Sequence, residues 1–256
     1  MKKFLILSIS LLIVSSLVYA DVISDLQTKK NNTQKTGISY TVVIPGEDEG
    51  DFSKDCIITE KGNAKLFETS ELGQQQMILL SDNKLYQVPA LLKTEKQSPV
   101  PVMVLSGDAK SGLDEKIEKF KVPDYKDFKV AGKATVNGYP CQILTKIILS
   151  EQKETEDGEK FLAEDSVKVY VIEKYGYPTK IEFIFTSKNM KGKVLHNEIQ
   201  NTINFVKFNT NISDKILSLP KNAMVIDPLN KNSFDPNAIK NQYMKKLHEQ
   251  YDRDDE

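Results

Sequence analysis

Alternation of apolar and polar residues is clearest over residues 166–187. In each half of this stretch, every second residue is β-branched or aromatic, which is the pattern of a strand with one buried face. These positions are Val167, Val169 and Val171 in the first half and Ile181, Phe183 and Phe185 in the second. Between the halves, Gly176 can take the positive φ of a tight turn, and Pro178 stands where a strand can begin. The stretch predicts a β-hairpin with one apolar face, although a register shift of one residue would exchange the two faces.

Similar short strands are predicted along most of the chain, separated by turn residues at intervals of roughly eight to twelve positions. Besides the hairpin, they cover residues 38–44, 52–60, 64–69, 75–81, 85–88, 128–134, 141–149 and 193–208. A sheet of this many strands tends to curl, and a twisted antiparallel sheet has one covered face. The predicted fold class is therefore mainly β, with a curved antiparallel sheet.

Helices are predicted at three places, and the Pro-rich, apolar residues 89–112 are predicted to form a packed loop. Residues 21–35 have few apolar positions and predict a short helix at best. A short amphipathic helix before Pro123 has its apolar residues at i, i+4 and i+7, namely Leu113, Ile117 and Phe120. This helix either packs on the sheet as a fixed plug or covers a cavity as a movable lid. A third helix is predicted after Asp235, where Ile239, Tyr243, Leu247 and Tyr251 repeat every four residues.

The first twenty residues have the composition of a secretory signal peptide. Lys2 and Lys3 precede an apolar run over residues 4–17, and small residues lead to a cleavage site between Ala20 and Asp21. The run is short for a membrane span, which needs about 20 apolar residues. We therefore predict a periplasmic or otherwise exported protein.

The two cysteines, Cys56 and Cys141, both lie in the exported part of the chain. Because export leads to an oxidising compartment, a disulfide between them is the leading interpretation, and two buried free thiols are the alternative. A redox site is not indicated, because the chain has no Cys-x-x-Cys motif.

Residues that could support catalysis are sparse. His196 and His248 are the only histidines, and they are far apart in the sequence. No cluster has the ligand spacing of a metal site, and no nucleophile or nucleotide motif is present. The formal net charge of −1 argues against a nucleic-acid partner. The sequence therefore predicts no enzyme, no metal and no cofactor, and directs attention to apolar surface.

Three short motifs occur in an order found in one family. They are Val136-Asn-Gly138-Tyr139-Pro-Cys141, Tyr175-Gly176-Tyr177-Pro178-Thr-Lys-Ile181 and Leu219-Pro220-Lys-Asn-Ala223. In this order they resemble the outer-membrane lipoprotein-sorting (LolA/LolB-like) superfamily, over about residues 38–227. The resemblance implies an incomplete, half-open antiparallel β-barrel with helices over an apolar cavity. It also implies binding of the acyl chains of lipids or lipoproteins, or a role as an envelope sensor.

From the motifs and the periodicity we predict a signal peptide over residues 1–20, a LolA-like domain over 21–227 and a helical tail over 228–256. The predicted partners are lipid acyl chains or lipidated proteins, which an apolar groove accepts without directional demands. The alternative is a self-filled interaction module of the same fold whose C-terminal helix binds a protein. The candidate cavity wall consists of Tyr40, Val42, Met77, Leu79, Leu113, Ile117, Phe120, Val167, Val169, Val171, Ile181, Phe183, Phe185, Ile203 and Phe205.

Overall fold

A computed structural model describes most of the chain after the predicted signal peptide. The described residues are 21–44, 54–71, 74–89, 100–106, 111, 121–219, 221, 223–229, 240–241 and 244. The predicted signal peptide, the lid-helix residues Leu113, Ile117 and Phe120, and most of the C-terminal tail lie outside them. Among the described residues, no helix is both long enough and apolar enough to cross a membrane.

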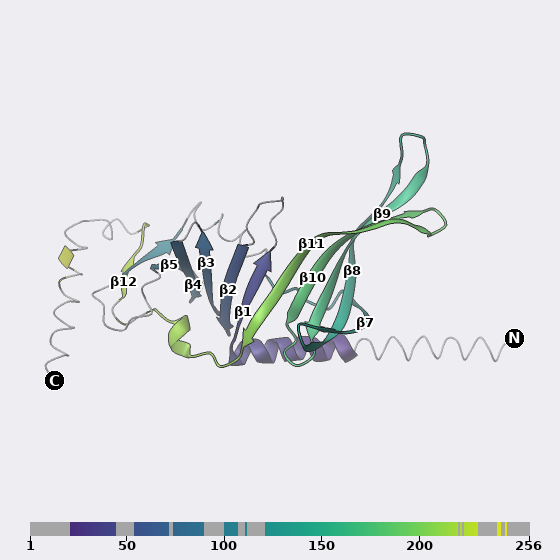
Figure 1. Cartoon of the computed structure of the whole chain (residues 1–256). Helices are drawn as coiled ribbons and strands as arrows, with labels where there is room; N and C mark the ends of the chain where they lie inside the picture. Colours follow the sequence, from purple (N-terminus) through teal and green to yellow (C-terminus); the bar gives the residue numbers. More distant parts are fainter. Residues whose placement is uncertain are drawn as a thin grey trace. The chain divides into compact units, whose positions relative to one another are not determined.

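Twelve strands of the described residues form one open sheet in the order β12-β6-β5-β4-β3-β2-β1-β11-β10-β9-β8-β7 (Figure 1). Wherever the pairing register is described, neighbouring strands are antiparallel, except that β12 pairs with β6 in parallel. The predicted mainly β fold with an open antiparallel sheet is confirmed, and the sheet does not close into a barrel. The strands are β1 (Ile38–Ile44), β2 (Lys54–Lys61), β3 (Ala64–Glu71), β4 (Gln74–Ser81), β5 (Lys84–Pro89), β6 (Val100–Leu105), β7 (Lys129–Val136), β8 (Tyr139–Glu154), β9 (Lys160–Ile172), β10 (Pro178–Asn189), β11 (Val194–Asn209) and β12 (Ala223–Ile226).

The chain divides into two compact units, of which the first comprises residues 21–33, 43–44 and 122–206 of the described chain. A helix over residues 21–36 begins in this unit and is longer than the sequence predicts. Its stability comes from tertiary contacts: Leu26 is buried, and the Lys30 Nζ donates to the Pro123 carbonyl at 3.0 Å. The Tyr125 backbone N–H donates to Gln27 Oε1 at 3.5 Å. Amphipathic packing therefore stabilises a helix that its own sequence only weakly favours.

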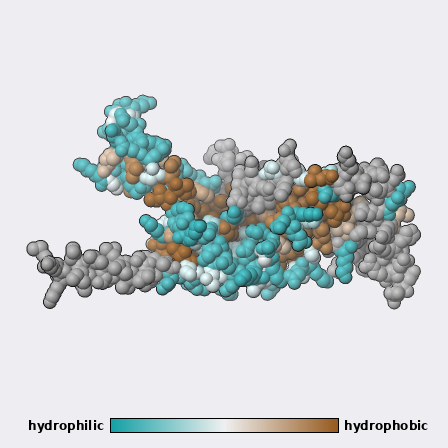
Figure 2. Space-filling view, turned by 180° about the vertical axis from the view of Figure 1, so that it is seen from behind, coloured by the Kyte–Doolittle hydropathy of each residue, from teal (hydrophilic) through white to brown (hydrophobic). Residues whose placement is uncertain are grey.

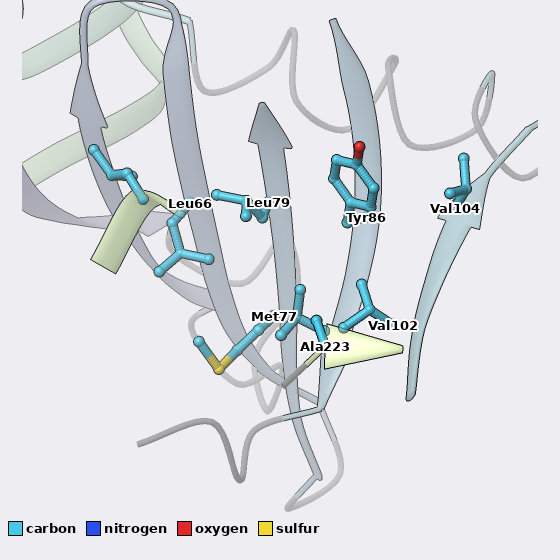
Figure 3. Close-up of a cluster of buried hydrophobic side chains, with 9 residues drawn as sticks. Leu66, Met77, Leu79, Tyr86, Val102, Val104 and Ala223 are labelled. Atoms are coloured by element: carbon cyan, nitrogen blue, oxygen red, sulfur yellow. The ribbon is translucent and has the colours of Figure 1, made fainter. Parts of the chain in front are cut away.

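The second unit contains strands β2 to β6, β12 and the 3-10 helix η2 (Asp214–Leu217). Its core joins residues from β3, β4, β5, β6, η2 and β12 in one apolar cluster (Figure 3). The cluster consists of Leu66, Met77, Leu79, Tyr86, Val88, Val102, Val104, Leu217 and Ala223. Two of the predicted cavity-wall residues, Met77 and Leu79, therefore lie in a filled core.

The disulfide predicted between Cys56 and Cys141 is wrong, because both residues are buried free thiols. Cys56 lies in β2 and Cys141 in β8, and β1, β11, β10 and β9 stand between these strands in the sheet order. A disulfide needs Cα atoms within about 7 Å, which only adjacent strands could provide here. Burial raises the pKa of the Cys56 thiol to about 12 and also raises the pKa of Cys141. Neither thiol is therefore activated as a nucleophile.

Candidate ligand-binding face

Two hairpins, β8–β9 and β10–β11, pair with each other in the first unit and give a sheet with two distinct faces. We call the face that carries Val167, Val169 and Val171 the valine face. The strand register places Ile181 opposite Val169 and Phe183 opposite Val167, so these residues share the valine face. On the outer strands, Leu144 pairs with Val169 and Ile203 pairs with Ile181. The valine face is therefore apolar across four strands in the row that contains Val169 and Ile181.

Exposure of the valine face changes along the strands. The row Leu144, Val169, Ile181 and Ile203 is buried, and Val169 has no exposed surface at all. One row further towards the hairpin tips, Val167 is still buried but its partner Phe183 is only partly buried. In the next row Phe185 is partly buried and Leu149 is 48% exposed. The apolar surface thus continues from a closed core into an accessible strip (Figure 2).

Polar side chains border this strip on both sides. The row that contains Val167 and Phe183 ends in Lys146 on β8 and Asn201 on β11. Lys146 forms an ion pair with Asp127, with 3.3 Å between Nζ and Oδ2. In the next row, Phe185 lies between Asp165 on β9 and Glu198 on β11, and Asp165 separates it from Leu149 on β8. The strip is therefore two strands wide, or roughly 10 Å, at Val167 and Phe183, and it narrows to the single strand β10 at Phe185.

The candidate residues separate into groups. Eight of them share the valine face of the first unit, namely Val167, Val169, Val171, Ile181, Phe183, Phe185, Ile203 and Phe205. Tyr40 and Val42 are buried in β1, whereas Met77 and Leu79 belong to the core of the second unit. Sequence reasoning missed Leu144 and Leu149 as members of the valine face. Leu144 could have been found from the alternation in β8, but a bulge between Ile147 and Leu149 shifts the register of the second residue.

The opposite face of the same hairpin carries a buried carboxylate, Glu182. Its Oε2 accepts a hydrogen bond from the Tyr170 hydroxyl at 3.0 Å, and its Oε1 lies 2.5 Å from Lys180 Nζ. Lys168 Nζ lies 3.8 Å from Oε2, and both lysines also lie over the Tyr170 ring. Burial alone would raise the pKa of Glu182, but the hydrogen bonds and charges of these partners outweigh it and lower the pKa. The cluster therefore fixes the pairing of β9 with β10.

Replacing Glu182 by glutamine is expected to lower the free energy of unfolding by about 1 kcal/mol at neutral pH. Since the pKa is lowered in the folded state, the carboxylate contributes its full stability above the ordinary value of 4.5. That contribution disappears as the pH falls through the folded-state pKa. Denaturant unfolding of both proteins between neutral and acidic pH should show the difference shrinking below pH 4.5. A difference that is constant with pH would contradict the assigned ion pairs.

A separate shallow hollow lies at the β7–β8 hairpin, with a volume of about 380 Å³. It is lined by Lys133, Ala134, Thr135, Pro140, Cys141 and Glu173. The Glu173 carboxylate accepts a hydrogen bond from Gln142 Nε2 at 2.6 Å and lies 3.4 Å from Lys133 Nζ. Cys141 pairs with Ile172, so it lies on the face opposite to the valines. The hollow therefore contains none of the predicted ligand-binding residues.

Among the described residues, no group of His, Cys, Asp and Glu side chains is arranged so that it could hold a metal ion. His196 lies at the edge of the valine face, with its Nε2 3.2 Å from Glu198 Oε2 and its ring 6.2 Å from that of Phe185.

No protein-family model and no curated protein matches the chain. Among solved structures, it is similar to an uncharacterized conserved protein from Thermus thermophilus, with 13% identity, coverage of 80% of this chain and 98% of the other, and a TM-score of 0.43. It is also similar to the structure of the MucA/MucB complex of Pseudomonas aeruginosa, with 13% identity, 81% and 64% coverage, and a TM-score of 0.41. For a LolA superfamily protein from Nitrosomonas europaea, the identity is 12%, the coverage 78% and 98%, and the TM-score 0.30. LolA superfamily structures are thus among those that the chain resembles.

Proposed function

We propose that this protein is an exported binding protein that accepts acyl chains of lipids or lipidated proteins on the valine face, and that it is not an enzyme. One observation carries the proposal: along β10, the apolar surface runs from Ile181, which is buried beside Val169 of β9, to the partly exposed Phe183 and Phe185. The order of the three sequence motifs supports it independently, because they resemble a family of lipoprotein-binding proteins.

The chemistry of the strip favours an aliphatic ligand over a polar one. Its central residues, Val167, Phe183 and Phe185, offer only carbon atoms, so a bound chain gains by leaving water and needs no hydrogen bonds. Polar residues at the borders, such as Lys146 and Asn201, can stay hydrated beside a ligand head group. An extended chain lying along β9 and β10 would therefore bury its methylenes while its polar end remains in water.

A series of saturated fatty acids from octanoate to palmitate tests the proposal. Because each buried methylene contributes roughly 0.8 kcal/mol, affinity is expected to rise about fourfold per added methylene while the strip still has uncovered surface. The matched control is a dicarboxylate of the same length, which should bind more weakly because its second charge must leave water. Displacement of an environment-sensitive fatty-acid probe would measure the affinities of the fatty acids and of the dicarboxylate. Absence of saturable binding, or affinity independent of chain length, would reject the proposal.

A further inference from the structure

The first half of β11 presents an open strand edge in the part of the chain that the structure describes. β11 has 16 residues and lies between β10 and β1, but β1 has only 7. The Tyr40 ring of β1 lies 6.1 Å from the ring of Phe208, so β1 accompanies the C-terminal end of β11. Residues 194–200 therefore pair with β10 on one side and have no described strand on the other.

This edge carries exposed apolar side chains. Val194, Leu195 and Ile199 are 51%, 58% and 51% exposed, and every residue between 191 and 201 is exposed. Edge strands of monomeric proteins are commonly protected by lysine or proline, which block pairing with another strand. Residues 194–200 contain neither. Bulges at the two ends of the segment leave His196 to Ile199 in regular register. Between the bulges, a regular edge without lysine or proline can act as a template for a further antiparallel strand.

The sequence of the edge is complementary to itself. Residues 195–199 read Leu-His-Asn-Glu-Ile, so an apolar residue stands at each end and a basic and an acidic residue flank the central Asn197. In an antiparallel pair of two such strands centred on Asn197, each His196 lies opposite Glu198 of the other strand. Each Leu195 then lies opposite Ile199. Shifting this register by one residue would break both His–Glu pairs and both apolar pairs.

We propose that the β11 edge binds a second copy of this chain through an antiparallel pairing centred on Asn197. The pairing is isologous, because each strand supplies the same residues to the other. Its two His–Glu pairs and two apolar pairs are all cross-strand neighbours, which stabilise antiparallel pairing. An edge of this length is smaller than the interface of a permanent dimer, so the dimer forms reversibly with protein concentration. The pairing also keeps the valine faces of both copies on the same side of the joined sheet.

Cysteine cross-linking tests the register of the dimer. In the variant Asn197→Cys, the two introduced thiols lie opposite each other, so mild oxidation should give a covalent dimer. Ser150→Cys, at an exposed position of the β8 edge, is the matched control and should stay monomeric. The wild-type protein should also stay monomeric on a non-reducing gel, since Cys56 and Cys141 are buried. Cross-linking through Ser150→Cys alone, or through neither variant, would overturn the proposal.

Sedimentation of charge variants gives a second, independent test. Glu198→Lys replaces the carboxylate opposite His196 by an ammonium group, which cannot accept a hydrogen bond from the imidazole, and we expect it to raise the dimer dissociation constant about tenfold or more. The double variant His196→Glu with Glu198→Lys places a carboxylate opposite an ammonium group in both pairs and should recover dimerisation. Both positions are exposed, so the fold should be retained. A wild-type protein that sediments as a monomer at every concentration, or a dimer indifferent to Glu198→Lys, would contradict the proposal.

Discussion

Replacing Gly176 by alanine is expected to lower the free energy of unfolding by about 3 kcal/mol or more. Gly176 has a φ of +68°, and an added Cβ would lie 2.3 Å from the Leu26 carbonyl oxygen and 2.4 Å from the Lys30 nitrogen. These are backbone atoms of the N-terminal helix and cannot move aside as a flexible side chain could. The Gly176 carbonyl also accepts a hydrogen bond from the buried Tyr125 hydroxyl at 3.0 Å. The substitution therefore separates the helix from the turn on which it packs.

Gly138→Ala is the matched control for this experiment. Gly138 also has a left-handed backbone, with a φ of +80°, but an added Cβ would meet nothing within 4 Å. The control substitution should therefore lower the free energy of unfolding by only about 1 kcal/mol, which is the cost of a left-handed backbone conformation for alanine. Guanidinium unfolding followed by circular dichroism would measure both variants. Equal losses of stability would show that the contact of Gly176 with the helix contributes nothing.

Replacing Phe185 by aspartate is expected to weaken fatty-acid binding at least about tenfold, because burial of an aromatic side chain contributes roughly 1.5–3 kcal/mol. The variant also places a charge beside the ligand. Ile184→Asp is the matched control, since Ile184 is the neighbouring residue, is also partly buried and lies on the opposite face. Probe displacement should show near wild-type affinity for this control. If both substitutions weaken binding equally, or if neither does, the fatty acid does not bind on the valine face.

The hairpin over residues 166–187 could be predicted from the sequence because its signals are local. Its alternation has the period of a strand, and one face is buried, so the register is strongly specified. Gly176 indeed has the positive φ that the turn requires. The eight predicted residues of this region fall on one face because they alternate along regular strands. The valine face was therefore largely predictable.

Other elements depend on contacts that the sequence does not reveal. Residues 100–105 form β6, although Pro99 and Pro101 suggest a loop. Pro101 is tolerated at an exposed position, and the strand is held between β5 and the distant β12. The helix over residues 21–36 needs Leu26 and Lys30 to pack on residues that follow about a hundred positions later. The bulge that brings Leu149 to the valine face likewise has no clear sequence signal.

The free thiols show how an argument from compartment can fail. Two cysteines in an exported chain favour a disulfide, but the oxidising compartment does not determine where the fold places them. Cys56 and Cys141 lie in strands that are not neighbours in the sheet. Whether the two cysteines can meet depends on the strand order, which is set by long-range pairing.

The most direct test of acyl-chain binding is to map where a bound chain lies. A fatty acid with a photoactivatable diazirine in its chain would be bound, irradiated and located by peptide mass spectrometry. We predict saturable labelling of Leu149, Phe183 and Phe185, competed by unlabelled palmitate. Labelling confined to Ile147, Ile184 and Ile199 on the opposite face, or no competed labelling of the described strands, would contradict the account.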